Sequence, residues 1–313
     1  MRVMAYARDG SPDVLELREV AKPVPKRREI LVRIRATTVP LSAGAPHQGR
    51  PGRSRIVVPG QELAGDVEAI GGDVTRFKAG DPVVAWTGLR LGTYAEYACL
   101  SERSTIFGKP AAMTYEEAAT LPTSGLDATY LLRKANIRPG ERMLFNGAGG
   151  SMGTYAVQIA KALGAEVTAV DSAPKLDMLR SIGADHVVDY TVQDCMDTSE
   201  TYDVIFDVIG DRSPRDILAR LSPRGRYITA VPSLAQMLTS RWARWSGDKS
   251  VIAWVPRTMG RQAKDFAFLE RLIEEGDVKA VLDRRFPLEQ ANDAYRYVAQ
   301  GNKKGHVILT MGS

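Results

Sequence analysis

The sequence predicts an α/β protein in which a β-rich region is followed by a doubly wound parallel sheet. Short β-type runs fill the chain up to Pro110, whereas strand-like and helix-like segments alternate after Gly140. A glycine-rich turn at 147–153 joins a short apolar strand to an amphipathic helix. Such alternation is typical of parallel sheets covered by helices.

The N-terminal region consists of apolar runs broken by Gly and Pro, and rich in Val, Ile, Thr and Tyr. These runs lie at 1–7, 14–20, 29–39, 63–71, 82–88 and 93–100. Such residues favour strands, so we expect a compact β domain here. From Thr114 the pattern changes to acids followed by apolar residues at helical spacing, which predicts a helix ending before Pro139.

Beyond Gly140 the pattern predicts strands and helices in alternation. The expected strands are 142–146, 166–170, 186–189, 203–208 and 226–231, and the expected helices are 152–163, 174–182 and 214–221. Two further helices at 265–276 and 288–300 and a strand at 306–311 complete the chain. The middle segment therefore predicts a parallel, doubly wound sheet.

The turn at 147–153 has the features of a phosphate-binding loop. Gly147, Gly150 and Gly153 allow a tight reversal, a close approach of backbone N–H groups to a ligand, and close packing of the helix on the strand. Unpaired N–H groups at the start of the helix favour an anion. We expect a dinucleotide pyrophosphate to contact Gly147, Ala148, Gly149, Gly150, Ser151, Met152 and Gly153.

Composition excludes several classes of protein. The 313 residues, 44% hydrophobic and 25% charged, are those of a globular protein. Neither a signal peptide nor an apolar run long enough to span a bilayer is seen, which favours a cytoplasmic location without membrane contact. The net charge of +5 comes from scattered basic patches at 22–29, 49–55 and 241–249, which we interpret as solvated surface rather than a nucleic-acid site.

The order of motifs resembles the medium-chain dehydrogenase/reductase superfamily, and within it the zinc-independent quinone oxidoreductase-like branch. The resemblance covers essentially the whole chain, through segments such as PGQELAGDVEAIGGDVTRFKAGDPV, NGAGGSMGTYAVQIAKALGAEV, YDVIFDVIG and KKGHVILT. It implies a GroES-like domain formed by 1–118 and 259–313, a Rossmann dinucleotide-binding domain at 119–258, and a homodimer in which residues 250–255 pair with a second copy.

The resemblance also permits a test for zinc. Zinc alcohol dehydrogenases of the superfamily carry a Gly-His-Glu motif with cysteine partners, whereas this chain has Gly60-Gln61-Glu62. Two cysteines, Cys99 and Cys195, and three histidines supply too few ligands for a sequence-local tetrahedral site. We therefore expect no metal, and we expect His47, His186 and His306 to lie at the surface or in loops.

The cofactor expected is NAD(P)H, with conflicting signals about which form. Asp171, at the end of the second strand, suits a ribose 2′-OH and repels a 2′-phosphate, which favours NADH. Lys175 and Tyr190 match positions by which NADPH-dependent relatives hold that phosphate, although Lys175 could equally be an exposed helix residue. The balance favours NADH weakly. Further cofactor contacts are expected at strand ends, from Val208, Ile209, Ala230 and Val231, where core packing is the alternative.

The candidate catalytic residues lie where the chain departs from the family pattern. The family's Asn-Pro pair and nearby tyrosine are replaced by Pro40-Leu41, which leaves His47 as a candidate proton donor. Asp127 stands where the family usually has a threonine near the nicotinamide; it could bond the carboxamide, stabilise the oxidised ring or turn elsewhere. Thr123 could reach the same region or cap a helix.

These features predict a zinc-independent oxidoreductase that transfers hydride from NAD(P)H to quinones or α,β-unsaturated carbonyls. Such acceptors spread the developing charge over a conjugated oxygen, so they need no strong Lewis acid. A zinc-free alcohol dehydrogenase or enoyl-thioester reductase is the alternative enzyme. A redox-sensing or adaptor protein that binds NAD(P)H without efficient turnover is the alternative outside enzymes.

Overall fold

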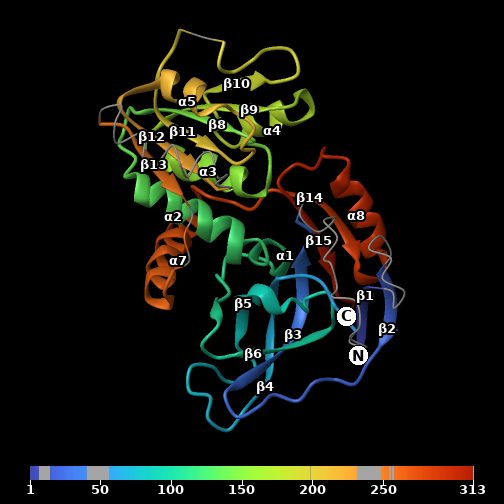
Figure 1. The fold of residues 1–313 in the computed structure, drawn as a ribbon. Helices are drawn as coiled ribbons and strands as arrows, with labels where there is room; N and C mark the ends of the chain where they lie inside the picture. Colours follow the sequence, from blue (N-terminus) through green and yellow to red (C-terminus); the bar gives the residue numbers. More distant parts are fainter. Residues whose placement is uncertain are drawn as a thin grey trace. The chain divides into compact units, whose positions relative to one another are not determined.

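The computed structural model describes residues 1–6, 15–40, 56–197, 199–230, 248–253, 255 and 257–312. The chain divides into two compact units, which are Met1–Thr123 with Ala280–Ser313, and Ser124–Lys279. The first contains the mixed sheet of a GroES-like domain and the second a parallel Rossmann-like sheet, so the predicted fold class is confirmed (Figure 1).

The first unit is a seven-stranded sheet with a separate two-stranded hairpin, β1-β2. The order of the sheet is β14-β15-β3-β4-β5-β7, and β6 pairs with β3 beside this path. The strands are β1 (Arg2–Tyr6), β2 (Leu15–Glu19), β3 (Glu29–Thr38), β4 (Glu62–Ile70), β5 (Pro82–Trp86), β6 (Tyr97–Ser101), β7 (Thr105–Gly108), β14 (Leu282–Pro287) and β15 (His306–Thr310). Its helical segments are η2 (Gly88–Arg90), α1 (Tyr115–Ala118), η5 (Leu288–Gln290) and α8 (Ala291–Ala299).

A π-helix, η3 (Leu121–Gly125), leads from α1 toward the second unit. Helix α1 begins with a capping box, since the Thr114 hydroxyl accepts from the N–H of Glu117 while the Glu117 carboxylate accepts from the N–H of Thr114. The local sequence therefore fixes where this helix starts, as the acids after Thr114 predicted.

The second unit is a parallel six-stranded sheet with the order β10-β9-β8-β11-β12-β13. The strands are β8 (Arg142–Asn146), β9 (Glu166–Asp171), β10 (His186–Asp189), β11 (Tyr202–Asp207), β12 (Leu221–Thr229) and β13 (Ser250–Ala253). The helices are α2 (Leu126–Ala135), α3 (Ser151–Ala162), η4 (Ala173–Lys175), α4 (Leu176–Ser181), α5 (Pro214–Arg220) and α7 (Met259–Glu274). Strand β12 starts five residues before the predicted Arg226, directly after α5.

The second unit extends further along the chain than the resemblance implied. Helix α7 was expected in the first domain, but it lies beside α2 (Figure 1). Arg133 Nη1 is 2.7 Å from Asp265 Oδ1, and Phe266 and Leu269 are buried. Because these contacts hold α7 on α2, the boundary falls after Lys279 rather than before residue 259.

One histidine was placed wrongly by the sequence. His306 was expected at the surface, yet it is 1% exposed, because β15 has β14 on one side and β3 on the other. Burial, together with the positive charge of Lys303, lowers the pKa of His306 to about 3. His186 is exposed, as expected, and His47 lies outside the described residues.

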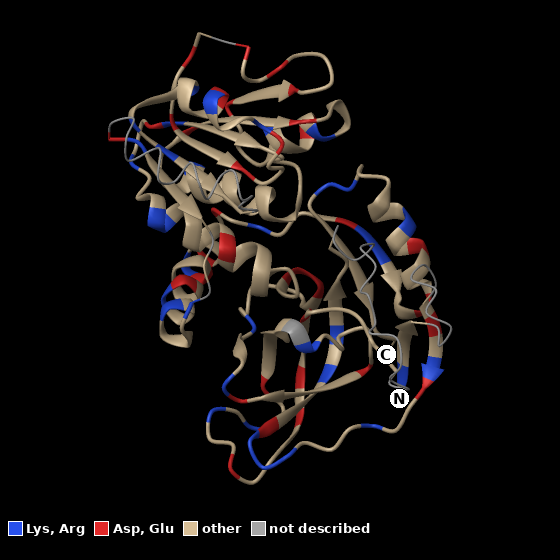
Figure 2. Cartoon of the chain, viewed as in Figure 1, with Lys and Arg blue, Asp and Glu red and all other residues tan. Residues whose placement is uncertain are grey.

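Charged residues of both signs occur along the described helices and strands of each unit (Figure 2). Figure 2 shows Lys and Arg interleaved with Asp and Glu along the elements of each unit. Of the three basic patches, 22–29 is described, whereas 49–55 and most of 241–249 lie outside the described residues. None of the helices within the described residues has the length and apolar character needed to cross a membrane.

Candidate dinucleotide-binding site

The glycine turn joins β8 to α3 at the carboxyl edge of the parallel sheet. Gly147 has φ of 85°, and a Cβ there would lie 2.7 Å from Val208 Cγ2. A Cβ on Gly153 would lie 2.2 Å from the carbonyl oxygen of Ala148. Both distances are shorter than van der Waals contact, so only glycine allows the loop after β11 and the first turn of α3 to pack this closely.

Helix α3 begins with backbone N–H groups directed at this turn. Its N-cap is Gly150, which has no side chain to cap the helix, and the first bond is from Thr154 N to Gly150 O at 3.1 Å. Within the described residues, no acceptor bonds the N–H of Met152 or Gly153. The arrangement is suited to an anion such as a pyrophosphate.

Asp171 and Lys175 form a buried ion pair beside the turn. Lys175 Nζ lies 2.9 Å from Asp171 Oδ1, and the two side chains are 10% and 6% exposed. Asp171 Oδ2 accepts from Gly149 N at 2.8 Å, and Oδ1 also accepts from Ser172 N at 2.9 Å. Lys175 is 8% exposed, so it is not the exposed helix residue that was the alternative.

Tyr190 lies close to this pair through the backbone. Its N–H donates to the carbonyl oxygen of Asp171 at 3.3 Å, while its side chain is 53% exposed. The structure therefore places Asp171, Lys175 and Tyr190 close together at the end of β9, with the Tyr190 side chain exposed.

Two buried polar residues that the sequence reasoning missed end the central strands. Asn146 of β8 and Asp207 of β11 are partners in register and are 4% and 1% exposed. Asp207 Oδ1 accepts from Asn146 Nδ2, Ile209 N and Gly210 N, each at 3.0 Å. Tyr227 donates its hydroxyl to Asp207 Oδ2 at 3.1 Å. Asp207 thereby fixes the loop that follows β11.

The remaining strand-end residues lie on this loop and the next. Val208 N donates to Asn146 O at 3.2 Å, and Ala230 N donates to Asp207 O at 3.4 Å. Ile209 is 55% exposed, so core packing does not account for it. Val231 lies outside the described residues.

Comparisons with known proteins show the family to which this chain belongs. Residues 26–111 match the model of the alcohol dehydrogenase GroES-like domain, and residues 182–309 match that of a zinc-binding dehydrogenase. A quinone-oxidoreductase homologue from spinach chloroplasts is 32% identical over 316 residues, which is 96% of this chain and 95% of that protein. The chain belongs to the medium-chain dehydrogenase/reductase superfamily, and is quinone oxidoreductase-like.

Other members of the superfamily match over their full length. The quinone oxidoreductase of Pseudomonas aeruginosa is 32% identical over 325 residues, covering 97% of this chain and 98% of its own. A solved NAD-dependent alcohol dehydrogenase has a TM-score of 0.84 at 28% identity and full coverage of both chains. The quinone oxidoreductase of Coxiella burnetii has a TM-score of 0.85 at 22% identity, with 99% of each chain covered, and supports the fold alone.

Asp127, which takes the place of the threonine usual in this superfamily, is paired with an arginine. Arg257 Nη2 donates to Asp127 Oδ1, and Arg257 Nη1 donates to the carbonyl oxygen of Leu126 at 3.2 Å. The guanidinium also lies 4.4 Å from the centre of the Tyr130 ring. Arg257 thus engages one oxygen of Asp127, and the role of Asp127 toward a nicotinamide stays a prediction.

Thr123 lies within the π-helix and is bonded to Glu62. Its N–H donates to Glu62 Oε1 at 2.9 Å, and its hydroxyl donates to the same oxygen. Thr38 donates its hydroxyl to Glu62 Oε2. Glu62 is 5% exposed and was not among the predicted site residues. The described bonds of Thr123 hold it to β4, and they are not those of a helix cap.

The segment that carries zinc ligands in other members of the superfamily has different partners here. Gln61 Nε2 donates to the carbonyl oxygen of Gly88 at 3.0 Å, and Glu62 is engaged by Thr38 and Thr123. Across the residues that the structure describes, no three His, Cys, Asp or Glu side chains form a group suited to a metal ion. His47 is not among them.

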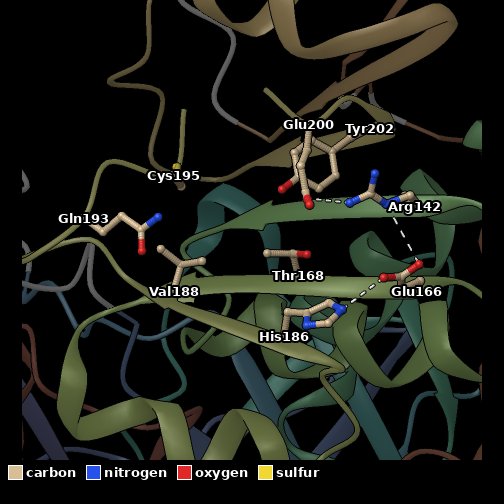
Figure 3. Close-up of a pocket in the computed structure, with 9 residues that line it drawn as sticks. All are labelled: Arg142, Glu166, Thr168, His186, Val188, Gln193, Cys195, Glu200 and Tyr202. Carbon is tan, nitrogen blue, oxygen red and sulfur yellow. Dashed lines mark hydrogen bonds and ion pairs between the residues drawn. The ribbon is translucent and has the colours of Figure 1, made fainter. Parts of the chain in front are cut away.

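A separate pocket of about 290 Å³ lies at the amino-terminal ends of β8, β9, β10 and β11 (Figure 3). It is lined by Arg142, Glu166, Thr168, His186, Val188, Gln193, Cys195, Glu200 and Tyr202. Arg142 Nη2 lies 2.5 Å from Glu200 Oε2, and Arg142 Nε lies 3.9 Å from Glu166 Oε2. The other oxygen of Glu166, Oε1, lies 3.0 Å from His186 Nε2. Burial raises the pKa of the Cys195 thiol, so it is a poor nucleophile. This pocket contains none of the predicted site residues.

Proposed function

We propose that this protein reduces quinones or α,β-unsaturated carbonyls with a hydride from a reduced nicotinamide dinucleotide. The observation that carries the proposal is the glycine turn with Asp171 at the end of the next strand, inside a quinone oxidoreductase-like chain. A relative from Arabidopsis thaliana is named an NADPH-dependent alkenal/one oxidoreductase and is 30% identical over 329 residues, covering 99% of this chain and 79% of its own.

The residues at the carboxyl edge fit such a dinucleotide. The N–H groups of Met152 and Gly153 would bind the pyrophosphate, and Asp171 would bind the adenosine ribose. When bound, the reduced nicotinamide supplies a hydride to the substrate carbon. Asp207 holds the loop of Val208 and Ile209 in place, and these two residues with Ala230 and Val231 would line the path toward the nicotinamide.

We further propose that NADH is preferred over NADPH. The Asp171 carboxylate is buried, and Lys175 is already bonded to it, so the lysine is not available to a 2′-phosphate. A phosphate at this position would meet a buried negative charge, which costs more than an exposed one. From the sequence alone, Asp171 favours NADH and Lys175 favours NADPH. The ion pair between them supports a preference for NADH.

Comparison of kcat/KM for the two cofactors tests this preference. We expect wild-type enzyme to favour NADH, and Asp171→Ser to release Lys175 and raise the relative use of NADPH at least tenfold, as expected when a charge-assisted bond replaces a repulsion. Adding Lys175→Ala to Asp171→Ser should reverse most of that gain. A wild type that already favours NADPH strongly would contradict the proposal.

The reaction itself is tested with a panel of substrates. We expect purified enzyme with NADH to reduce quinones and enones, to oxidise primary alcohols slowly or not at all, and to keep its activity after treatment with EDTA. Oxidation of primary alcohols that is lost with EDTA would instead establish a zinc alcohol dehydrogenase. Tight NADH binding without turnover on any carbonyl would establish a redox-sensing or adaptor protein.

Proton donation and assembly stay predictions. His47 is the candidate donor, and His47→Gln should lower kcat without changing NADH affinity. Thr123 cannot donate its hydroxyl proton to a substrate while it donates to Glu62.

Strand β13 lies at one end of the described order of the parallel sheet, and an edge strand in this position is suited to pairing with a second copy in a homodimer. A molar mass from light scattering equal to one chain would exclude the dimer. A cytoplasmic location is checked by cell fractionation.

A further inference from the structure

Asn146 and Asp207 end the two strands at which the sheet changes direction. From β8 the chain order proceeds through β9 and β10 on one side, and from β11 through β12 and β13 on the other. In open parallel sheets, ligands bind outside the carboxyl ends of the strands at this reversal. Asn146 and Asp207 are the last residues of β8 and β11, and they face each other in register.

The orientation of the Asn146 amide is fixed by its neighbours. Nδ2 lies 3.0 Å from Asp207 Oδ1 and 3.4 Å from Asp211 Oδ1. Carboxylates only accept hydrogen bonds, so a flipped amide would set its oxygen against two negative charges. Asp207 is itself held by Ile209 N, Gly210 N and the Tyr227 hydroxyl. The amide hydrogens are therefore committed to these carboxylates.

The opposite end of the amide is a hydrogen-bond acceptor without a described donor. Asn146 is 4% exposed, and no residue that the structure describes donates to its Oδ1. A ligand donor that reaches this oxygen would add one hydrogen bond to the amide. Asn146 directly precedes Gly147, which is the first residue of the proposed phosphate-binding turn.

We propose that Asn146 Oδ1 accepts a hydrogen bond from the nicotinamide-riboside half of the bound dinucleotide. The inference rests on the proposed function and deepens it. Phosphate oxygens are acceptors, so the partner is a ribose hydroxyl or the carboxamide N–H. Asp171 assigns the adenosine half to the β9 side of β8, and Asn146 and Asp207 lie toward β11, on the other side. Asp207 is a positioning residue that holds the amide in this orientation.

Binding of three probes to wild type and Asn146→Ala tests the proposal by calorimetry. ADP lacks the second ribose, ADP-ribose contains it, and NADH adds the carboxamide. Loss of one hydrogen bond is worth roughly a fivefold change in affinity. If a ribose hydroxyl is the donor, Asn146→Ala weakens ADP-ribose and NADH equally and leaves ADP unchanged. If the carboxamide is the donor, only NADH is weakened.

Two results would overturn the inference, which are an equal loss for all three probes and no loss for any of them. Asp207→Asn has the same shape and holds the amide less firmly, so it should give the same pattern with a smaller change, even if Asn146→Ala folds poorly. Thermal melting of each variant reports folding separately. Failure of wild-type enzyme to bind ADP and NADH would contradict the proposed function, whereas binding without discrimination by Asn146→Ala would contradict only the role of Asn146.

Discussion

The two edges of the parallel sheet use similar side chains in opposite ways. At the carboxyl edge, Asp171 and Asp207 are buried and accept from backbone N–H groups of the glycine turn and the loop after β11. At the amino edge, Arg142 pairs with Glu166 and Glu200, whose side chains are 44% and 53% exposed. The aspartates at the carboxyl edge fix the backbone of two loops, whereas the charges at the amino edge pair with one another at exposed positions.

The largest effect should follow from a change in the glycine turn. A methyl group on Gly153 would lie 2.2 Å from a carbonyl oxygen, so Gly153→Ala must move α3 away from the turn. We expect a loss of about 3 kcal/mol in unfolding free energy and loss of NADH binding. Urea unfolding and calorimetry measure these two effects.

Gly260→Ala in α7 is the matched control. A Cβ on Gly260 meets nothing within 4 Å, so the variant should keep or raise stability and bind NADH normally. Normal cofactor binding by Gly153→Ala would remove the claim that the carboxyl edge is built for close backbone approach.

The second effect compares one aspartate from each edge. Asp207→Ala removes the carboxylate that accepts from two backbone N–H groups, the Asn146 amide and the Tyr227 hydroxyl. It should lower the free energy of unfolding by about 3 kcal/mol. Asp185→Ala removes the acceptor of Val167 N and Lys161 at a partly exposed site, and should cost about 1 kcal/mol. Equal losses of unfolding free energy for the two variants, measured with urea, would show that the aspartates at the two edges contribute equally to stability.

A smaller effect concerns pH at the amino edge. Burial on its own raises the pKa of Asp185, but hydrogen bonds from Lys161 and Val167 N outweigh it and leave the pKa below its ordinary value. The stabilisation is therefore present above the unfolded pKa and is lost as pH falls through the folded one. The stability difference between wild type and Asp185→Asn should be constant above about pH 5 and shrink as the pH falls through about 4 and below. A difference that is constant with pH would contradict this.

The smallest effect should come from the exposed ion pair of Arg142 and Glu200. Their side chains are 36% and 53% exposed, and pairs of this kind contribute less than about 1 kcal/mol. Glu200→Gln should leave the melting temperature and kcat/KM almost unchanged. If Glu200→Gln lost as much stability as Asp207→Ala, charged residues at the amino edge would contribute as much to stability as the buried ones at the carboxyl edge.

The difference between the edges explains what the sequence could predict. The turn at 147–153 and Asp171 belong to one strand-helix-strand segment, so their spacing alone indicates the site. Asn146 and Asp207 are joined only by the pairing of β8 with β11, and Asp127 meets Arg257 from a distant part of the chain. Such partners depend on strand order and helix packing, which residue spacing does not specify.

The position of α7 and the burial of His306 were missed for the same reason. Helical spacing predicts that residues 265–276 form a helix, but not that the helix packs on α2. The pattern of 306–311 predicts a strand, but not that β14 and β3 flank it. The Asp171 and Lys175 pair is different, since its spacing was visible and only the direction of the lysine was unknown.

Strand β15 has a consequence for how the chain is made. Ile308 pairs with Thr38 and Thr310 with Ala36, so the end of β3 acquires this neighbour only after residues 306–310 have been synthesised. The unit Ser124–Lys279 is continuous in sequence and is fully synthesised earlier. During translation, the parallel sheet can close while the edge of β3 at residues 36–38 is still open. An unpaired strand edge is a site of aggregation, so a nascent chain stalled before β15 is the form that most needs a chaperone.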